Sequence, residues 1–256
     1  MKEKRLRLDL LLVDRGLAET TQKAIGIILS GSVFVDGRLT DKAGALCNEN
    51  AEINIKQQMP FVSRGGIKLQ EAISHFQLEL TDMIAMDIGA STGGFTDCLL
   101  QNGVKRVYAI DVGYGQLHWK LRDDPRIVNL EKTHILKLDW TIIKDVINIV
   151  TIDVSFISLT KILASLWKHL SPAALIIALV KPQFEVGKGE VGKGGIVRDP
   201  DKIASAVNKV IQFAEAIGFR VMGSIPSPIP GQKGNREYLI LLRPCHSELV
   251  SESDRC

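Results

Sequence analysis

Cysteine is scarce in this chain and shows no pairing pattern. The 256 residues include four cysteines, and no two of them have the C-x-x-C spacing of a zinc site. Their scatter also argues against a disulfide scaffold of the kind that small secreted domains use. We therefore expect free thiols at Cys47, Cys98, Cys245 and Cys256, no metal centre, and a reducing, cytoplasmic environment.

Long apolar runs and strong net charge are also lacking. The longest apolar run, residues 173–180, is far shorter than the roughly 20 residues that a bilayer-spanning helix needs. Basic residues and leucines begin the chain, but Asp9 interrupts them and no small-residue cleavage site follows. The net charge is only +3, so any binding of nucleic acid must come from a local patch. These features predict a chain without a secretory signal or membrane span.

A glycine-rich run, DIGASTGGFT from Asp87 to Thr96, is the most distinctive motif. The apolar residues before it are typical of a buried parallel strand, and a helix is predicted directly after the two glycines. Glycines let the backbone approach a ligand closely, and a helix start offers free N–H groups. The spacing G-x-x-x-G-G differs from the dinucleotide pattern G-x-G-x-x-G, which disfavours nicotinamide or flavin. The run therefore predicts a pocket for another nucleotide-type cofactor.

The cofactor contacts expected from this pattern include one acidic residue beyond the run itself. Asp111 ends the next apolar strand, where a carboxylate can accept both hydroxyls of an adenosine ribose; capping of the next helix is its alternative role. The candidate cofactor-binding residues are Asp87, Gly89, Ala90, Ser91, Thr92, Gly93, Gly94, Phe95 and Asp111.

From residue 80 onward, strand and helix signals alternate. This order predicts an α/β fold with a mostly parallel sheet and helices on both faces. A proline- and glycine-rich loop then separates two segments, 219–225 and 237–242, that predict a closing hairpin with one antiparallel strand. The other predicted strands are 83–87, 106–111, 126–130, 147–153 and 173–181, and the clearest helices are 159–170 and 199–217.

The first 58 residues have a different pattern, with two short helices at 7–15 and 20–29 and strands at 32–38 and 51–56. This segment resembles the small α+β RNA-binding domain shared by ribosomal small-subunit protein four and many pseudouridine synthases. Arg5, Arg7 and Lys23 are its candidate phosphate contacts, although each alone is more often a solvated surface cation. The predicted organisation is a small domain at 1–58, a linker at 59–66, a large domain at 67–244 and a loose tail at 245–256.

Two polar residues, Asp153 and Lys181, follow apolar strands of the predicted sheet. Functional groups gather at the carboxyl ends of parallel strands. A lysine there is costly to bury unless an acid pairs with it, and Asp153 and Glu185 are the nearest candidates. Alone, such a lysine usually extends its charge toward water, so the expected pairing with Asp153 is what favours a functional role.

A wider set of motifs resembles one family. SRGGIKL at 63–69, the glycine-rich run, DVSFISL, LVKPQFEVGKGEVGKGGIVRD and KGNREYLI together look like the TlyA family, often labelled hemolysins. Those proteins are similar to FtsJ-type ribose 2′-O-methyltransferases, with a Rossmann-like fold, S-adenosylmethionine as cofactor, and ribosomal RNA or ribosomal subunits as partner. The resemblance implies a catalytic tetrad of Lys68, Asp153, Lys181 and Glu237, and a cytidine ribose as acceptor. Without it, Lys68 and Glu237 would be ordinary surface-helix and strand residues.

The segment 187–195 is rich in glycine and carries Lys188 and Lys193, which we expect to contact RNA phosphates; a flexible surface connection is the equally favoured alternative. Arg64 is likewise either an RNA contact or part of a hinge. Two other functions stay open at this point. A nicotinamide-dependent oxidoreductase would have to use His118 or His134, and a membrane-active hemolysin would need an amphipathic or spanning segment that the sequence lacks.

Overall fold

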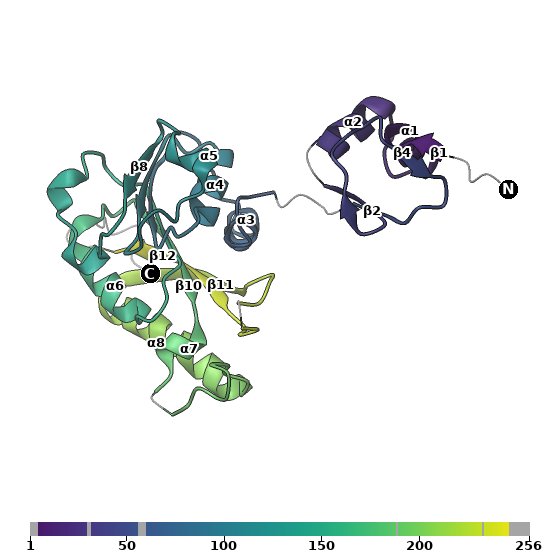
Figure 1. Ribbon diagram of the computed structural model, residues 1–256. Helices are drawn as coiled ribbons and strands as arrows, with labels where there is room; N and C mark the ends of the chain where they lie inside the picture. The colour runs from purple at the N-terminus through teal and green to yellow at the C-terminus, as the bar shows by residue number, and fades with distance from the viewer. Residues whose placement is uncertain (1–4, 30–31, 56–59, 188, 232, 246–256) are drawn as a thin grey trace. The chain divides into compact units, whose positions relative to one another are not determined.

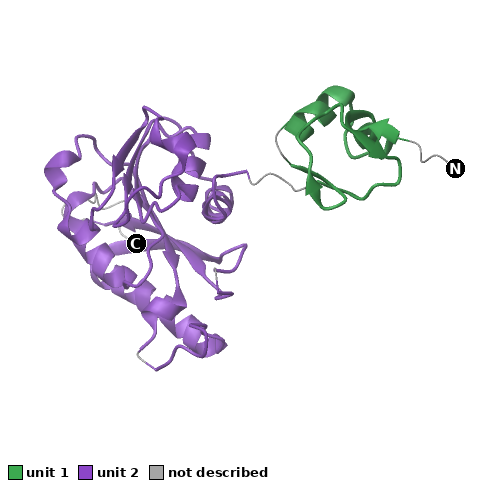
Figure 2. Ribbon diagram, viewed as in Figure 1, with its two compact units in different colours: residues 1–59 green, residues 60–256 purple. Residues whose placement is uncertain are grey.

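The computed structural model describes residues 5–29, 32–55, 60–187, 189–231 and 233–245. The chain forms two compact units, Met1–Met59 and Pro60–Cys256 (Figure 2). The predicted linker at 59–66 overlaps the start of the second unit, where helix α3 begins at Gly65. Residues 246–256 of the predicted tail lie outside the described part of the chain.

The first unit is built on a short helix pair. Leu8, Leu11 and Leu12 bury one face of α1 (Leu8–Asp14), and Ala24 and Ile28 bury one face of α2 (Thr21–Leu29), all within one apolar cluster. The predicted strand at 32–38 is instead a short hairpin of β2 (Val33–Val35) and β3 (Arg38–Leu39). β2 also pairs with β5 (Ile53–Ile55), which lies within the predicted strand at 51–56. A second antiparallel pair, β1 (Arg5–Arg7) with β4 (Leu46–Asn48), was not predicted.

The second unit contains a seven-stranded sheet in the order β11-β12-β10-β9-β6-β7-β8 (Figure 1). The neighbours from β10 to β8 pair in parallel, and β12 is antiparallel to both β10 and β11. The prediction of a mostly parallel sheet with one antiparallel strand is therefore confirmed. The strands are β6 (Ile84–Ile88), β7 (Arg106–Ile110), β8 (Ile127–Leu130), β9 (Ile149–Ile152), β10 (Leu175–Val180), β11 (Phe219–Pro226) and β12 (Tyr238–Pro244).

Both faces of this sheet are covered by helices, and β10 shows why. Its alternate side chains at 176, 178 and 180 join the cluster of α6 (Leu159–Leu166) and α8 (Pro200–Ala216). Ile177 and Leu179 join the cluster of α3 (Gly65–His75) and α4 (Gly94–Gln101) on the other face. Apolar residues at every position suit a strand that is buried on both faces. The helices are α3 (Gly65–His75), α4 (Gly94–Gln101), α5 (Trp119–Arg122), α6 (Leu159–Leu166), α7 (Pro182–Glu185) and α8 (Pro200–Ala216), with 3-10 turns at Ile135–Lys137, Trp140–Ile142 and Trp167–His169.

The carboxyl ends of the parallel strands meet at one edge of the sheet. Gly89 follows β6, Asp153 follows β9 and Lys181 follows β10, and the antiparallel β12 brings its first residues to the same edge. Among the described residues, no helix combines the length and apolar character that crossing a membrane requires.

Candidate active site

A pocket of about 510 Å³ opens at this edge of the sheet. Its walls come from α3 and the residues just before it, the loop after β6, and the residues after β9 and β10. The glycine-rich segment and the turn before β12 complete them. The volume lies within the range of about 300–1,000 Å³ that is usual for small-molecule sites. The four residues proposed as a tetrad, Lys68, Asp153, Lys181 and Glu237, all line it.

These four residues form two ion pairs. Lys68 Nζ lies 2.5 Å from Glu237 Oε2, and both side chains are buried, at 10% and 3% exposure. Lys181 Nζ lies 2.6 Å from Asp153 Oδ1 and donates a hydrogen bond to Ser155 Oγ at 3.2 Å. Lys68 and Glu237 are 169 positions apart in the sequence, so only the fold joins them. The pocket thus holds two lysine ammonium groups, each fixed by a carboxylate.

Two buried acceptor atoms among the described residues lack a hydrogen bond, and both belong to the pocket. They are Asp153 Oδ1 and Gln183 Oε1. Asp153 Oδ1 is close enough to Lys181 for an ion pair, but the two groups do not have hydrogen-bond geometry. Unsatisfied buried polar atoms are few in folded proteins and often mark functional sites.

The loop after β6 forms a tight cradle on one side of the pocket. Gly89 has a φ of +85°, and a side chain there would collide with the backbone oxygen of Asp153. Gly93 caps α4 with a φ of 91° and leaves no room for a side chain against Leu117 and Leu121. The loop therefore passes the end of β9 at a distance that only glycine permits. The predicted cofactor contacts that line the pocket are Gly89, Ala90, Ser91, Thr92, Gly94 and Phe95.

The other predicted cofactor contacts, Asp87, Gly93 and Asp111, do not line the pocket. Asp87 is fully buried and accepts hydrogen bonds from Thr96 Oγ1 at 2.6 Å and Thr151 Oγ1 at 2.9 Å. Asp111 accepts the N–H groups of Ser91 at 2.8 Å and of Gly113 at 2.6 Å. The Asp87 carboxylate thus ties β6 to α4 and β9, and its contact with a cofactor stays a prediction.

Burial, together with the smaller effect of the Asp153 charge, raises the pKa of Asp87 to about 6 against the opposing effect of the two threonine hydrogen bonds. Because the folded state then binds more protons than the unfolded state between about pH 4 and 6, stability gains from this group as the pH falls through that window. A pKa difference of about two between the folded and unfolded states changes the free energy of unfolding by an amount on the order of 3 kcal/mol.

We expect Asp87→Asn to remove this pH dependence. Urea unfolding at pH 4.5, 5.5 and 7 checks it, and tryptophan fluorescence reports on the second unit because Trp119, Trp140 and Trp167 all lie there. The difference in unfolding free energy between wild type and variant should change with pH; a constant difference would contradict the assignment.

The predicted RNA contacts fall into two groups. In the second unit, Arg64 is exposed and lines the pocket, Lys193 is exposed but does not line it, and Lys188 lies outside the described residues. In the first unit, Arg5 is exposed and Lys23 pairs with Glu19.

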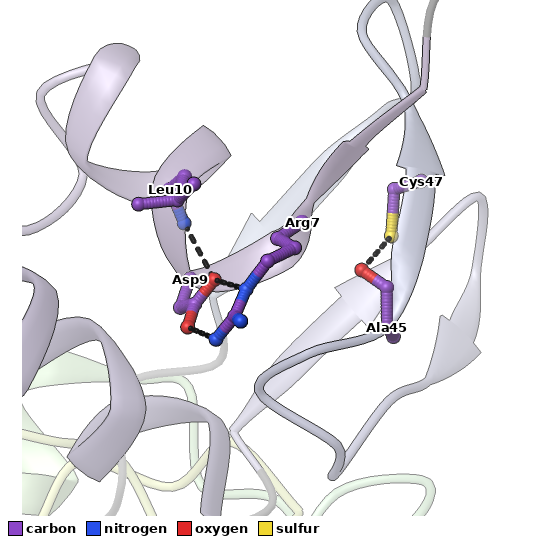
Figure 3. A network of polar contacts seen from close by, with 5 residues as sticks. All are labelled: Arg7, Asp9, Leu10, Ala45 and Cys47. Atoms are coloured by element: carbon purple, nitrogen blue, oxygen red, sulfur yellow. Dashed lines mark hydrogen bonds and ion pairs between the residues drawn. The ribbon is translucent and has the colours of Figure 1, made fainter.

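Arg7 has an intramolecular partner (Figure 3). Its guanidinium donates to both carboxylate oxygens of Asp9, at 3.1 and 2.6 Å, and Asp9 also accepts the N–H of Leu10. Arg7 holds the pKa of the Asp9 carboxyl below its usual range. Its guanidinium therefore compensates a carboxylate with no exposed surface, so a phosphate at Arg7 would compete with Asp9.

Sequence reasoning missed several residues of the pocket. Phe156 is 91% exposed with a φ of +65°, and its ring lies 5.1 Å from that of Phe184. Ser155, Gln183, Lys233 and Asn235 also line the walls. Phe156 stands in the same short run as Asp153, and an aromatic residue directly after a functional strand end was the one signal available for it.

Comparison with known proteins gives a consistent result. The family described as FtsJ-like methyltransferase matches residues 61–244. Hemolysin A of Brachyspira hyodysenteriae is 43% identical over 236 residues, covering 91% of this chain and 98% of that protein. The 16S/23S rRNA (cytidine-2′-O)-methyltransferase TlyA of Mycobacterium tuberculosis is 43% identical over 242 residues, covering 94% and 90%.

Solved structures give the same fold. A hemolysin-named protein from Streptococcus thermophilus superposes with a TM-score of 0.73 at 42% identity, covering 95% of this chain and 90% of that one. An S-adenosylmethionine-dependent methyltransferase from Mesorhizobium loti gives a TM-score of 0.50 at 13% identity, covering 68% and 96%, and supports the fold alone. Among the described residues, no cluster of His, Cys, Asp or Glu side chains could hold a metal ion.

Proposed function

This chain belongs to the FtsJ-like methyltransferase family, and we propose that it transfers a methyl group from S-adenosylmethionine to a ribose 2′-hydroxyl, of a cytidine, in ribosomal RNA. The observation that carries the proposal is the joining of two lysine–carboxylate pairs and a glycine cradle in one pocket. The relatives named as rRNA methyltransferases support the choice of acceptor.

The cradle fits the cofactor that the family implies. Gly89 and Gly93 let the loop pack closely against Asp153, Leu117 and Leu121, and the first N–H groups of α4 follow directly. Asp111 keeps this loop in place through Ser91 and Gly113. Residues 89–92, 94 and 95 would contact the cofactor, which supplies an electrophilic methyl group when bound.

The paired residues on the other side of the pocket would act on the acceptor hydroxyl. The 2′-oxygen would gain the methyl carbon as the bond from that carbon to the cofactor sulfur breaks. It would lose its proton either to Lys181 Nζ in its neutral form or to water, while Lys181 orients the hydroxyl as a cation. Asp153 and Ser155 fix the position of Nζ in both cases. Lys68 and Glu237 complete the wall and position the ribose.

The exposed ring of Phe156 offers a stacking surface for the base of the acceptor nucleotide. Aromatic side chains commonly bind unpaired bases in this way, at about 1–3 kcal/mol per base. Arg64 at the pocket and Arg5 in the first unit remain our candidates for phosphate contacts, with Lys23, Arg7, Lys188 and Lys193 as further predictions.

The alternative of a nicotinamide-dependent oxidoreductase has no support from the site. His118 and His134, its candidate residues, each accept a backbone N–H through Nδ1 at the start of a short helix, at 3.2 Å. Neither lines the pocket.

Incubation with radiolabelled S-adenosylmethionine tests the proposal, using separated ribosomal subunits and naked rRNA as acceptors. We expect alkali-stable label in RNA, because a 2′-O-methyl group blocks cleavage at that ribose. Absence of label from every RNA acceptor, despite measurable binding of the cofactor, would refute the proposed acceptor.

A further inference from the structure

The charged residues that line the pocket leave an excess of positive charge. Lys68 and Lys181 are neutralised by Glu237 and Asp153. The remaining cations of the lining are Arg64 and Lys233, and neither has an ion-pair partner among the described residues. A pocket with uncompensated cations favours an anionic ligand.

Lys233 stands on a turn that is fixed at its base. Gly231 N–H donates to the backbone oxygen of Asn235 at 2.9 Å, and Gly234 N–H donates to that of Gly231 at 2.9 Å. The buried Asn235 side chain accepts from Val197 N–H and donates to the Gly195 oxygen, each at 2.9 Å. The turn before β12 is thus joined to the end of the glycine-rich segment.

The Lys233 side chain lies across Gly195. A Cβ atom added to Gly195 would be 3.4 Å from Lys233 Nζ and 3.6 Å from its Cδ. Both residues line the pocket, so the exposed Lys233 side chain lies at its wall beside a residue without a side chain. No carboxylate in the described part of the chain accounts for this placement.

The position of the turn indicates which ligand supplies the anionic group near Lys233. The cofactor cradle follows β6, and the turn precedes β12, three strands away in the sheet order. That separation corresponds to about 14 Å between strand axes. The Lys181–Asp153 pair follows β10 and β9, between these two regions, and Glu237 directly precedes β12. Lys233 is therefore on the side where the acceptor would bind. In RNA, the 3′-oxygen next to a 2′-hydroxyl carries a phosphate, which places an anion close to the reacting group.

We infer that Lys233 binds an RNA phosphate that flanks the acceptor ribose. The side-chain hydrogen bonds of Asn235 to Gly195 and Val197 keep the turn that carries Lys233 in place. This inference rests on the proposed function, since it names a further contact for the same acceptor. The cofactor carboxylate is the other anion that could occupy the pocket, and the experiment separates the two.

Lys233→Gln, Lys233→Arg and a matched control, Lys105→Gln, are compared in steady-state methyl transfer to rRNA over a range of salt concentrations. Lys105 is exposed and precedes β7, at the opposite edge of the sheet. We expect Lys233→Gln to raise KM for RNA about 10-fold, as loss of one charge-assisted contact would, with kcat little changed. The slope of log(kcat/KM) against log salt is negative, and its magnitude should decrease by about 0.7–0.9 in this variant. Lys233→Arg and Lys105→Gln should behave as wild type.

Calorimetric titration with S-adenosylmethionine and fluorescence anisotropy with a short cytidine-containing RNA oligonucleotide complete the test. Unchanged cofactor affinity together with weaker RNA binding in Lys233→Gln supports the inference. Weaker cofactor binding would assign Lys233 to the cofactor carboxylate, and unchanged RNA affinity and salt slope would also overturn the inference. The anisotropy measurement needs no turnover. A failure of the proposed function, seen as a wild type that methylates no RNA, is therefore distinguishable from a failure of the Lys233 contact, seen as unchanged RNA binding in Lys233→Gln.

Discussion

Replacement of Lys181 by methionine is expected to lower kcat by about 10²- to 10⁴-fold, the usual contribution of a group that receives or orients a proton. Methionine fills the space of the lysine side chain but cannot hydrogen-bond Ser155 or pair with Asp153. The cradle at 89–95 contains no part of this pair, so affinity for S-adenosylmethionine should be preserved. Single-turnover methyl transfer and calorimetric titration measure the two effects separately.

Lys181→Arg separates a base from a fixed cation. Arginine stays protonated, so near-normal turnover in this variant would contradict the base role and leave Lys181 as a positioning cation. Lys105→Met, at the opposite edge of the sheet, is the matched control and should keep full activity. A Lys181→Met variant with kcat close to that of wild type would remove Lys181 from the mechanism altogether.

Breaking the ion pair between Lys68 and Glu237 should lower both the stability and the activity of the protein. In Glu237→Ala, the Lys68 ammonium would remain buried at 10% exposure without its carboxylate. Removing one partner of a buried pair typically costs about 3–5 kcal/mol in the free energy of unfolding. Urea unfolding followed by tryptophan fluorescence measures this loss in the second unit, and methyl transfer measures activity under conditions where the variant is folded.

The double variant Lys68→Met/Glu237→Leu distinguishes a structural pair from a functional one. Apolar residues of similar volume often replace a buried ion pair without loss of stability. We expect the double variant to regain most of the stability lost in Glu237→Ala but none of the activity. If both return, the pair serves only the fold; if Glu237→Ala unfolds like wild type, the pair contributes little to stability.

The sheet could be predicted because its signals are local. An apolar run that is buried on both faces, such as β10, and a polar residue at its end are both visible within ten residues of sequence. The positions of Asp153 and Lys181 at neighbouring strand ends followed from this alternation. Their contact was therefore expected from the residues themselves, before any family was considered.

The rest of the pocket depends on contacts that no local pattern encodes. Lys68 meets Glu237 across 169 positions, and the resemblance to a known family was what suggested both. Asn235 reaches the glycine-rich segment through its side chain, so its neighbours along the chain give no sign of that role. The burial of Asp87 on β6 could not be predicted either. An acidic residue at a strand end has the same sequence pattern whether it contacts a ligand or a threonine.

The most direct test of a ribose 2′-hydroxyl as acceptor is the identity of the methylated nucleoside. RNA methylated by the wild-type protein would be digested completely to nucleosides and analysed by mass spectrometry. We predict 2′-O-methylcytidine, with the added mass on the ribose fragment, and its loss in Lys181→Met. A methyl group on the base fragment would contradict the assignment of the paired lysines to a ribose hydroxyl.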